Sequence, residues 1–511
     1  MNRVTRSELK ISKIKTKNMG NKVTGLVALA FLLFTGTVNG QDDNYNFTVH
    51  TLGGYTTPGV VPFWLRSNQY GSIPIDGASF SLIGSVSKDY DLSGDKFFDW
   101  GTSFEGRANL GQGSNLTLIE GYGKVRLGIF ELRAGRSKEI MGICDTTLSS
   151  GSFSISGNNL GIPKVEVSVP EFFIIPGLGQ LFAVKGNFSH GWMGEYSVRK
   201  DGGDEDTVLV KTFLHQKSLY GRFGKPSWNL KLYGGFNHQV MWGNEQESFN
   251  NDFTLSPMTT FLYVLVGKNF NNGSIQATRP GDHLGSLDIG VEYEFNEIKL
   301  LVYRQNFYEA GGLAHLANIQ DGLNGISIEK LQSNDNQGIW KKINFEFLYT
   351  KNQAWDLWLP ETSNRYENYY NHYFYINGWS YKGIGLGTPF ISSKNDTRAE
   401  LASAPDDYFI NNRLIAFNLG CQGMVKNIEY IFRASWSRNY GTYITTDEEQ
   451  SPIISNPLLY GIFGVQEQFS TYLELNRELK KNYNLGFVGA FDTGDLYYNS
   501  VGVFLKVSRS F

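Results

Sequence analysis

Apolar and polar residues alternate along much of this chain with a period of two. In residues 286–305, two alternating runs flank a tight Asn296-Glu297 turn. Because side chains of a strand point alternately to its two faces, this pattern predicts a hairpin with one apolar and one polar face. Such a hairpin suits a transmembrane barrel, with its apolar face toward lipid and its polar face toward the lumen. A β-sandwich shows the same alternation. The apolar positions are Leu287, Ile289, Val291, Tyr293, Phe295, Ile298, Leu300 and Val302.

Residues 501–511 extend this alternation to the end of the chain. A chain that ends on an aromatic residue within such a strand resembles the C-terminal signal by which outer-membrane β-barrels are recognised by their assembly machinery. Arg509 interrupts the apolar face one step before the end, and the alternative is the last strand of a soluble sheet. The apolar face carries Val501, Val503, Leu505, Val507 and the terminal Phe511.

The first 40 residues have the three parts of a secretory signal peptide. Residues 1–22 carry seven Lys and Arg against one acid, residues 23–34 are largely apolar, and Val38-Asn39-Gly40 supplies small residues for cleavage. The apolar run is too short for a mature transmembrane helix. We therefore expect export with cleavage after Gly40, with Met19 as an alternative start. The cleavage site lacks the Cys of a lipoprotein.

Connection lengths predict how many strands there are. From residue 286 onward, short turns near 296–297, 333–338, 426–427 and 478–483 alternate with long segments 306–323, 351–412 and 438–467. Bacterial barrels have short periplasmic turns, long outer loops and an even number of strands. Nine strands fit after residue 286 and nine fit before it, so we expect an all-β, antiparallel transmembrane barrel of 18 strands.

The same pattern divides the chain into parts. Residues 1–40 are assigned to the signal peptide, 41–75 to a periplasmic or plug segment, and 76–511 to the barrel with long extracellular loops. Residues 257–267 and 310–319 are predicted short helices in loops folded over or into the barrel mouth. One more buried strand is the alternative for the first.

Composition excludes several classes of protein. Residues 1–40 hold seven of the 46 basic and one of the 49 acidic residues, so the remainder has a net charge of about −9. This acidity argues against a nucleic-acid partner. A mean hydropathy of −0.28, without any mature apolar run of 18 residues, excludes a helical membrane protein. Cys144 and Cys421 could pair, although two buried free thiols fit better, and the scattered histidines predict no metal or cofactor.

Four motifs resemble the capsule-assembly Wzi family of outer-membrane proteins, in the form found in Bacteroidetes-type bacteria. They are TPGVVPFWLRSNQYG (57–71), RPGDHLGS (279–286), DGLNGI (321–326) and YYNHYFYINGWSYKGIGLGTPF (369–390). The resemblance implies an 18-stranded barrel whose lumen is blocked by loops and internal segments. It further implies a lectin that binds exported capsular or other surface polysaccharide, without catalysis. We expect the protein to be a monomer. Well-known members carry an N-terminal helical bundle, which the Gly, Pro and β-branched residues of 41–75 disfavour.

The segment 351–390 combines aromatic rings for sugar C–H faces with polar groups for hydroxyls. The alternative is that its rings form an interfacial girdle or pack the loop against itself. If they bind sugar, replacing Trp379 or Tyr373 by Ala should weaken polysaccharide retention without loss of barrel assembly. The candidates are Trp355, Trp358, Arg365, Tyr366, Tyr369, Tyr370, Asn371, His372, Tyr373, Tyr375 and Trp379.

Four charged residues are further candidates, and catalytic motifs are weak. Arg66 and Arg304 could meet an acidic sugar from the lumen or a loop, or be paired structurally, whereas Asp282 and Asp321 lie in Gly-rich motifs that favour turns. The chain lacks a G-x-S-x-G motif and a P-loop. Two other functions stay open: an open porin or sugar-uptake channel, and a barrel hydrolase.

Overall fold

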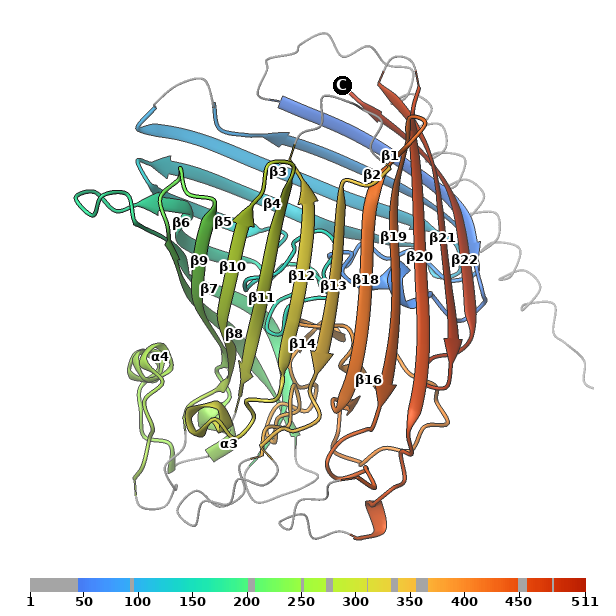
Figure 1. Ribbon diagram of the computed structural model, residues 1–511. Coiled ribbons are helices and arrows are strands. Elements are labelled where there is room, and N and C mark those ends of the chain that lie inside the picture. The colour runs from blue at the N-terminus through green and yellow to red at the C-terminus, as the bar shows by residue number, and fades with distance from the viewer. Residues whose placement is uncertain are drawn as a thin grey trace, which may run out of the picture.

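The computed structural model describes residues 45–511 apart from 92–95, 201–206, 250–251, 273–278, 310, 332–338, 355–365, 449–456 and 480–481. Eighteen strands form one antiparallel sheet, in which β1 pairs with both β2 and β22, so that the sheet closes into a barrel (Figure 1). The barrel strands are β1 Tyr45–Thr56, β2 Ala78–Lys88, β3 Phe98–Leu110, β4 Asn115–Leu127, β5 Phe130–Arg136, β6 Lys164–Ile174, β7 Phe182–Arg199, β8 Thr207–Phe223, β9 Leu230–Trp242, β10 Asp282–Glu294, β11 Ile298–Tyr308, β12 Gly322–Lys330, β13 Lys342–Tyr349, β18 Leu414–Val425, β19 Ile428–Asn439, β20 Gln466–Glu478, β21 Tyr483–Gly494 and β22 Ser500–Ser510. Nine barrel strands, β1 to β9, precede the strand that contains residue 286. Nine more follow, β10 to β13 and β18 to β22, and the predicted total of 18 is confirmed.

The alternating apolar side chains point outward. Val501, Val503 and Leu505 of β22 are exposed, while their neighbours Gly502 and Phe504 are buried. The same holds for Leu287 and Ile289 of β10, which flank buried Asp288. An apolar outer wall around a polar interior is the arrangement of a transmembrane barrel, and the β-sandwich alternative is excluded.

The two rims differ in the length of their connections. At the rim where the chain ends, β4 and β5 are joined by residues 128–129, β18 and β19 by 426–427, and β20 and β21 by 479–482. At the opposite rim, β9 and β10 are joined by 243–281 and β13 and β18 by 350–413. We assign the first rim to the periplasm and the second to the exterior. The sides predicted for the short turns and long segments agree with this arrangement.

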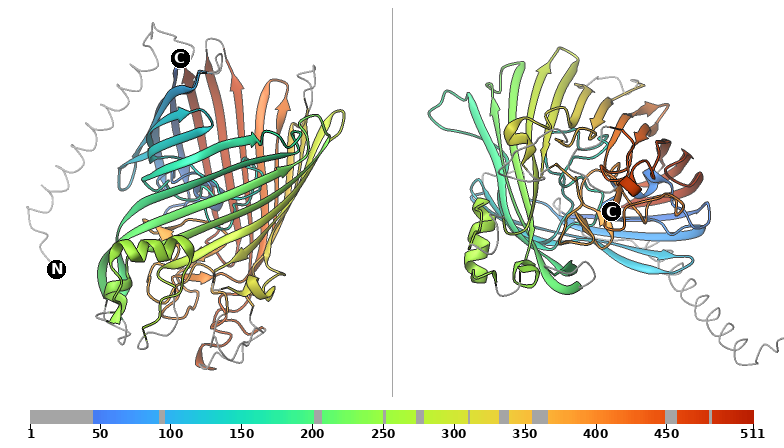
Figure 2. Two further views of the ribbon diagram at one scale, coloured as in Figure 1. Left: turned by 90° about the vertical axis from the view of Figure 1, so that its left-hand side faces the viewer. Right: turned by 90° about the horizontal axis from the view of Figure 1, so that it is seen from below.

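Three connections of the exterior rim fold back into the lumen, and we call them together the plug. They are 57–77, 137–163 and the described part of 350–413, and Figure 2 shows them in the barrel interior when it is viewed along its axis. The plug contains the short helix α2 (Phe63–Arg66) and two small hairpins, β14 (Ser380–Tyr381) with β15 (Ile384–Gly385), and β16 (Ser392–Ser393) with β17 (Phe409–Asn411). A continuous apolar cluster joins all three segments through side chains such as Phe63, Phe153 and Trp379.

The assignment of residues 41–75 needs correction. Tyr45–Thr56 is strand β1 of the wall, so the barrel begins about thirty residues earlier than the boundary at 76. Only the part after Thr56 enters the lumen, and it does so from the exterior rim because β1 runs antiparallel to β22. Gly53 and Gly54 weaken the strand pattern in the sequence. In the structure a side chain at position 54 would collide with the ring of Phe504, which explains why a glycine stands there. The predicted signal peptide lies outside the described residues.

Two predicted helices are present, but one of them is in an unexpected place. Residues 257–266 form α4 (Pro257–Val266), and the segment 310–319 contains the 3-10 helix η2 (Gly312–His315). The described residues also form α3 (Glu245–Phe249) and the 3-10 helix η3 (Pro457–Leu459). The prediction that α4 folds over or into the barrel mouth is wrong, because α4 lies against the outside of the wall (Figure 2). In the described part of the chain, no helix has the length and apolar character needed to cross a membrane.

The two cysteines are both free thiols. Cys144 is buried in the plug, whereas Cys421 of β18 is half-buried and has the same parity as the exposed Phe417 and Leu419 of the outer wall. The prediction that they do not pair is confirmed, but Cys421 is not fully buried. They lie on opposite faces of the wall.

Candidate functional site: the plug and its exterior face

Most of the aromatic candidates that the structure describes pack the plug instead of facing outward. Tyr369, Tyr370 and Trp379 are completely buried. Trp379 Nε1 donates to the carbonyl oxygen of Ser154 at 2.8 Å, and the Tyr370 hydroxyl donates to the carbonyl of Phe153. These rings tie the 350–413 segment to the 137–163 segment. The prediction that these three rings stack on an external sugar is therefore wrong. They follow the alternative, in which the rings pack the loop.

The carboxylates of Asp321 and Glu367 connect exterior loops by hydrogen bonds to backbone N–H groups. The Asp321 carboxylate accepts the backbone N–H groups of Asn352 at 2.9 Å and Gln353 at 2.7 Å, and also the Tyr369 hydroxyl at 2.7 Å. Glu367 accepts the backbone N–H groups that precede and begin η2. Burial raises the pKa of Asp321 to about 7. The role of Asp321 thus extends beyond making a turn.

Carboxylates of the wall hold the other two plug segments by their backbone. Asp288 of β10 accepts the Ile143 N–H at 2.7 Å, Glu346 of β13 accepts the Ser150 N–H at 2.5 Å, and Asp492 of β21 accepts the Phe63 N–H at 2.7 Å. Each is a buried, inward-facing residue. The sequence reading missed this role, although the polar positions of the alternating runs were the signal for it.

Of the remaining charged candidates, Arg66 and Arg304 have structural partners and Asp282 is buried in a strand. Arg66 forms a salt bridge with Asp396 at 2.7 Å inside the plug. Arg304 lies on the same strand face as the exposed Val302, so it points to the outer side of the wall and its assignment to the lumen is corrected. Its guanidinium donates to Asn306 and Asn324, both at 2.7 Å. Asp282 is the buried first residue of β10, within a strand rather than a turn.

Tyr373 differs from these buried rings because its side chain is open to the exterior. It is 54% exposed and lies at the exterior end of β7, where the Phe374 carbonyl accepts the Arg199 N–H at 2.9 Å. The Arg199 guanidinium lies 5.7 Å from the Tyr373 ring centroid and 2.5 Å from the Asp406 carboxylate. Tyr373, Arg199 and Asp406 therefore place a flat ring, a cation and an anion side by side, and we call them the rim cluster.

The neighbours of Tyr373 serve mainly to hold its loop. The Asn371 side chain exchanges two 2.9 Å hydrogen bonds with the backbone of Phe409. His372 Nδ1 accepts the N–H groups of Phe374 and Tyr375, and burial lowers the pKa of this imidazole to about 4, so it is neutral at pH 7. Trp355, Trp358 and Arg365 lie outside the described residues.

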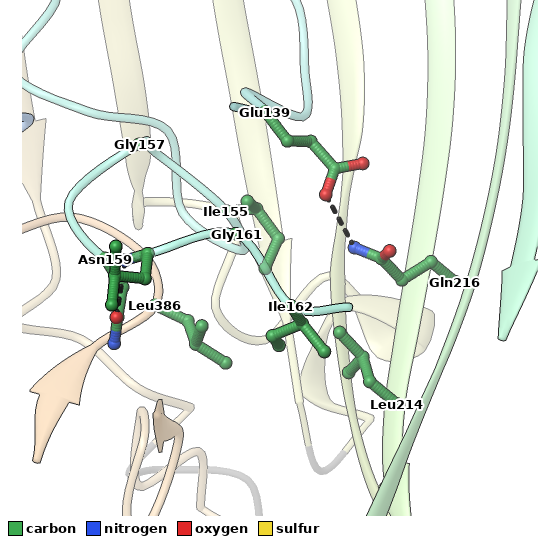
Figure 3. A pocket seen from close by; sticks show the side chains of 10 residues that line it. Glu139, Ile155, Gly157, Asn159, Gly161, Ile162, Leu214, Gln216 and Leu386 are labelled. Atoms are coloured by element: carbon green, nitrogen blue, oxygen red, sulfur yellow. Dashed lines mark hydrogen bonds between the residues drawn. The ribbon is translucent and has the colours of Figure 1, made fainter. Parts of the chain in front are cut away.

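The cavities that border the plug are small, whereas an open hollow of about 870 Å³ lies at the periplasmic ends of β18 to β21, beside Met424, Asn476 and Asn484. Figure 3 shows one of about 20 Å³ between the 155–162 part of the plug and β8, where Gln216 donates to Glu139 at 3.3 Å. Two others measure about 130 Å³ beside Arg433 and about 180 Å³ beside Glu474. All three are smaller than typical small-molecule sites of ~300 to 1,000 Å³. Within the described ranges no group of three or more His, Cys, Asp or Glu is arranged to hold a metal ion.

The family of the chain follows from sequence comparison. The family model of the capsule assembly protein Wzi matches residues 34–418, a range that includes all four motifs noted above. The chain belongs to this family. None of the curated protein sequences compared with the chain matches it.

Solved structures add a likeness in fold. The chain is similar to Wzi of Escherichia coli, an outer membrane protein involved in group 1 capsule assembly and a carbohydrate-binding β-barrel, with a TM-score of 0.52 and 14% identity over 90% of this chain and 83% of that chain. OccAB2 of Acinetobacter baumannii matches with a TM-score of 0.44 and 10% identity over 92% of this chain and 98% of that one. OccD3 of Pseudomonas aeruginosa matches with a TM-score of 0.41 and 10% identity over 93% of this chain and 92% of that one. The barrel, its apolar outer wall and the family together make this chain an outer-membrane protein.

Proposed function

We propose that this barrel binds capsular or other surface polysaccharide on its exterior face and helps to hold it at the cell surface. The observation that carries this proposal is the rim cluster, in which an exposed ring stands beside a fixed cation and anion. Aromatic faces pack on sugar C–H groups, while carboxylates and guanidinium groups bind hydroxyls and acidic substituents. Carbohydrate binding by the related E. coli barrel supports the same assignment.

The proposed binding is non-covalent and needs neither a cofactor nor a metal. Lipid of the outer membrane surrounds the wall, the barrel-assembly machinery inserts it after signal-peptide cleavage, and the protein acts as a monomer. A hydrolase would require a pair of carboxyl groups facing a sugar-sized cleft. A purified protein that shortens the polysaccharide it binds would favour that alternative.

The rim cluster predicts a modest and specific effect of Tyr373→Ala. Loss of one stacking ring should weaken polysaccharide binding by about 1 kcal/mol, which is about a fivefold rise in Kd, without affecting assembly. The measurement is binding of purified barrel to polysaccharide extracted from the native surface. Tyr498→Ala is the matched control, because Tyr498 is an exposed exterior tyrosine at 36% that bonds to Glu400 and lies outside the cluster. Equal Kd values for wild type and Tyr373→Ala would rule out the cluster as the site.

The plug predicts that the barrel does not conduct ions steadily. The plug occupies the lumen, and wall carboxylates hold its 57–77 and 137–163 segments, so single barrels in planar bilayers should leave the conductance at its background value. An open porin or sugar-uptake channel would instead give discrete, long-lived steps. Such steps from the wild-type protein would favour the channel alternative over retention of polysaccharide.

A further inference from the structure

Helix α4 lies outside the barrel, across the wall formed by β7 to β10 (Figure 2). The helix begins at Pro257 after the N-cap Ser256, whose hydroxyl accepts the Thr259 N–H at 3.3 Å, and it ends at the left-handed Gly267. This part of the connection between β9 and β10 thus lies along the outer surface, whereas the plug lies in the lumen.

One side of α4 is packed on the wall. Val264 is fully buried in a cluster with Val240 and Trp242 of β9. The Phe261 ring lies 5.4 Å from the His190 ring and 5.8 Å from the His215 ring. Lys217 of β8 donates its ammonium to the Leu265 carbonyl at the C-terminal end of the helix, where a cation is favourable.

Beneath α4 the outer wall is unusually polar. Residues that are paired across adjacent strands share a face of the sheet. Lys217 pairs with His238, and Leu219 pairs with Phe236 two positions along the same strands. Because Leu219 and Phe236 are exposed on the outside, Lys217 and His238 face outward as well. The outward-facing polar side chains of this area are His190, His215, Lys217, His238 and His283. Polar groups on a lipid-facing wall are costly, and α4 covers three of these side chains, His190, His215 and Lys217.

The other side of α4 is apolar as well. Met258, Leu262 and Val266 are 69%, 53% and 65% exposed, and their spacing of four residues aligns them in one stripe. A helix that is apolar on both sides is unsuited to water. The stripe continues the apolar outer wall, whose exposed residues on neighbouring β10 include Leu287 and Ile289.

We propose that α4 is an in-plane membrane helix, with the stripe of Met258, Leu262 and Val266 in contact with the acyl chains of the outer leaflet. It replaces a polar sector of the wall by an apolar surface and thereby sets the depth of this sector in the bilayer. The inference is independent of the polysaccharide-binding proposal, because none of its residues belongs to the rim cluster.

The test places a nitroxide spin label on Leu262→Cys in the full-length protein, with Cys144→Ala and Cys421→Ala to remove the native thiols. The barrel is reconstituted in phosphatidylcholine–phosphatidylglycerol vesicles, and the label's accessibility to oxygen and to a water-soluble nickel chelate is compared. Ile289→Cys on β10 is the control for lipid contact. Leu458→Cys is the control for an exposed leucine in water, because it is 85% exposed in an exterior loop.

The expected result is that oxygen exceeds nickel accessibility at 262 as it does at 289, while the order is reversed at 458. A ratio at 262 equal to that at 458 would show that the stripe faces water and would overturn the proposal. Spin–spin broadening at 262 that disappears on dilution with unlabelled barrel would also overturn it, because the stripe would then contact a second copy. Met258→Cys repeats the test one turn away and must agree.

Discussion

Replacing Trp379 by Ala is expected to loosen the plug, not to remove a sugar contact. The Trp379 side chain is fully buried and donates to the Ser154 carbonyl, so its loss leaves both a large cavity and an unpaired buried oxygen. Phe or Trp to Ala substitutions in packed cores cost about 3 to 5 kcal/mol. Hydrogen exchange measured by mass spectrometry should show faster exchange in residues 369–391 and in 152–158. The strands should keep their protection, because their ladder bonds do not involve this ring.

Trp379→Phe separates the two contributions. It keeps most of the volume but loses the N–H donor, so the cost should fall to about 1 to 3 kcal/mol. Tyr373→Ala serves as the surface control and should leave exchange in both plug segments unchanged. Weaker polysaccharide binding by Trp379→Ala with wild-type exchange in the plug would mean that the ring contacts sugar after all.

The barrel wall was largely predictable from sequence because its pattern has a local cause. Each outward residue must match lipid, so Leu287, Ile289 and Val291 alternate within a few positions of one another, and the parity of short and long connections then follows. The first strand was missed because Gly53 and Gly54 lower the strand signal, whereas in space they lie against β22.

The roles of the plug residues were less predictable because their partners are distant in sequence. Trp379 and its acceptor Ser154 are 225 residues apart, and Glu346 and Ser150 are 196 apart. The sequence of a loop rich in aromatic residues is the same whether its rings bind sugar or pack against each other. The rim cluster could not be predicted for the same reason. Arg199 belongs to β7, and nothing in the sequence around it indicates that it contacts Tyr373.

Helix α4 illustrates a different limit. Ser256, Pro257 and Gly267 mark its ends clearly in the sequence, so the helix itself was predicted. Its position depends on His215 and His238, whose outward direction is fixed only by the register of β8 and β9. Local capping determines that a helix forms, whereas the polar area on a remote surface determines where it packs.

Replacing Glu346 by Ala is expected to release the 137–163 segment from the wall. The Glu346 carboxylate accepts the Ser149 hydroxyl at 2.7 Å, the Ser150 N–H at 2.5 Å and the Tyr303 hydroxyl at 2.6 Å, all buried. Its removal leaves the Ser149 hydroxyl and the Ser150 N–H without an acceptor, whereas the Tyr303 hydroxyl keeps Asn344 Oδ1 at 3.2 Å. Each unsatisfied buried group costs about 1 to 3 kcal/mol. Hydrogen exchange should accelerate around residues 148–152, and brief conductance steps should appear in planar bilayers where the wild type shows none.

Glu292→Ala is the matched control for this experiment. Glu292 is also a wall carboxylate of β10, but its partners Lys231 and Tyr233 both belong to β9, and it makes no bond to the described residues of the plug. It should therefore leave exchange at 148–152 and the conductance unchanged. If both variants opened the barrel equally, general loss of wall charge would explain the effect. If only Glu346→Ala does so, one carboxylate holds a segment of the plug closed, and occlusion of the lumen is built from such single anchors.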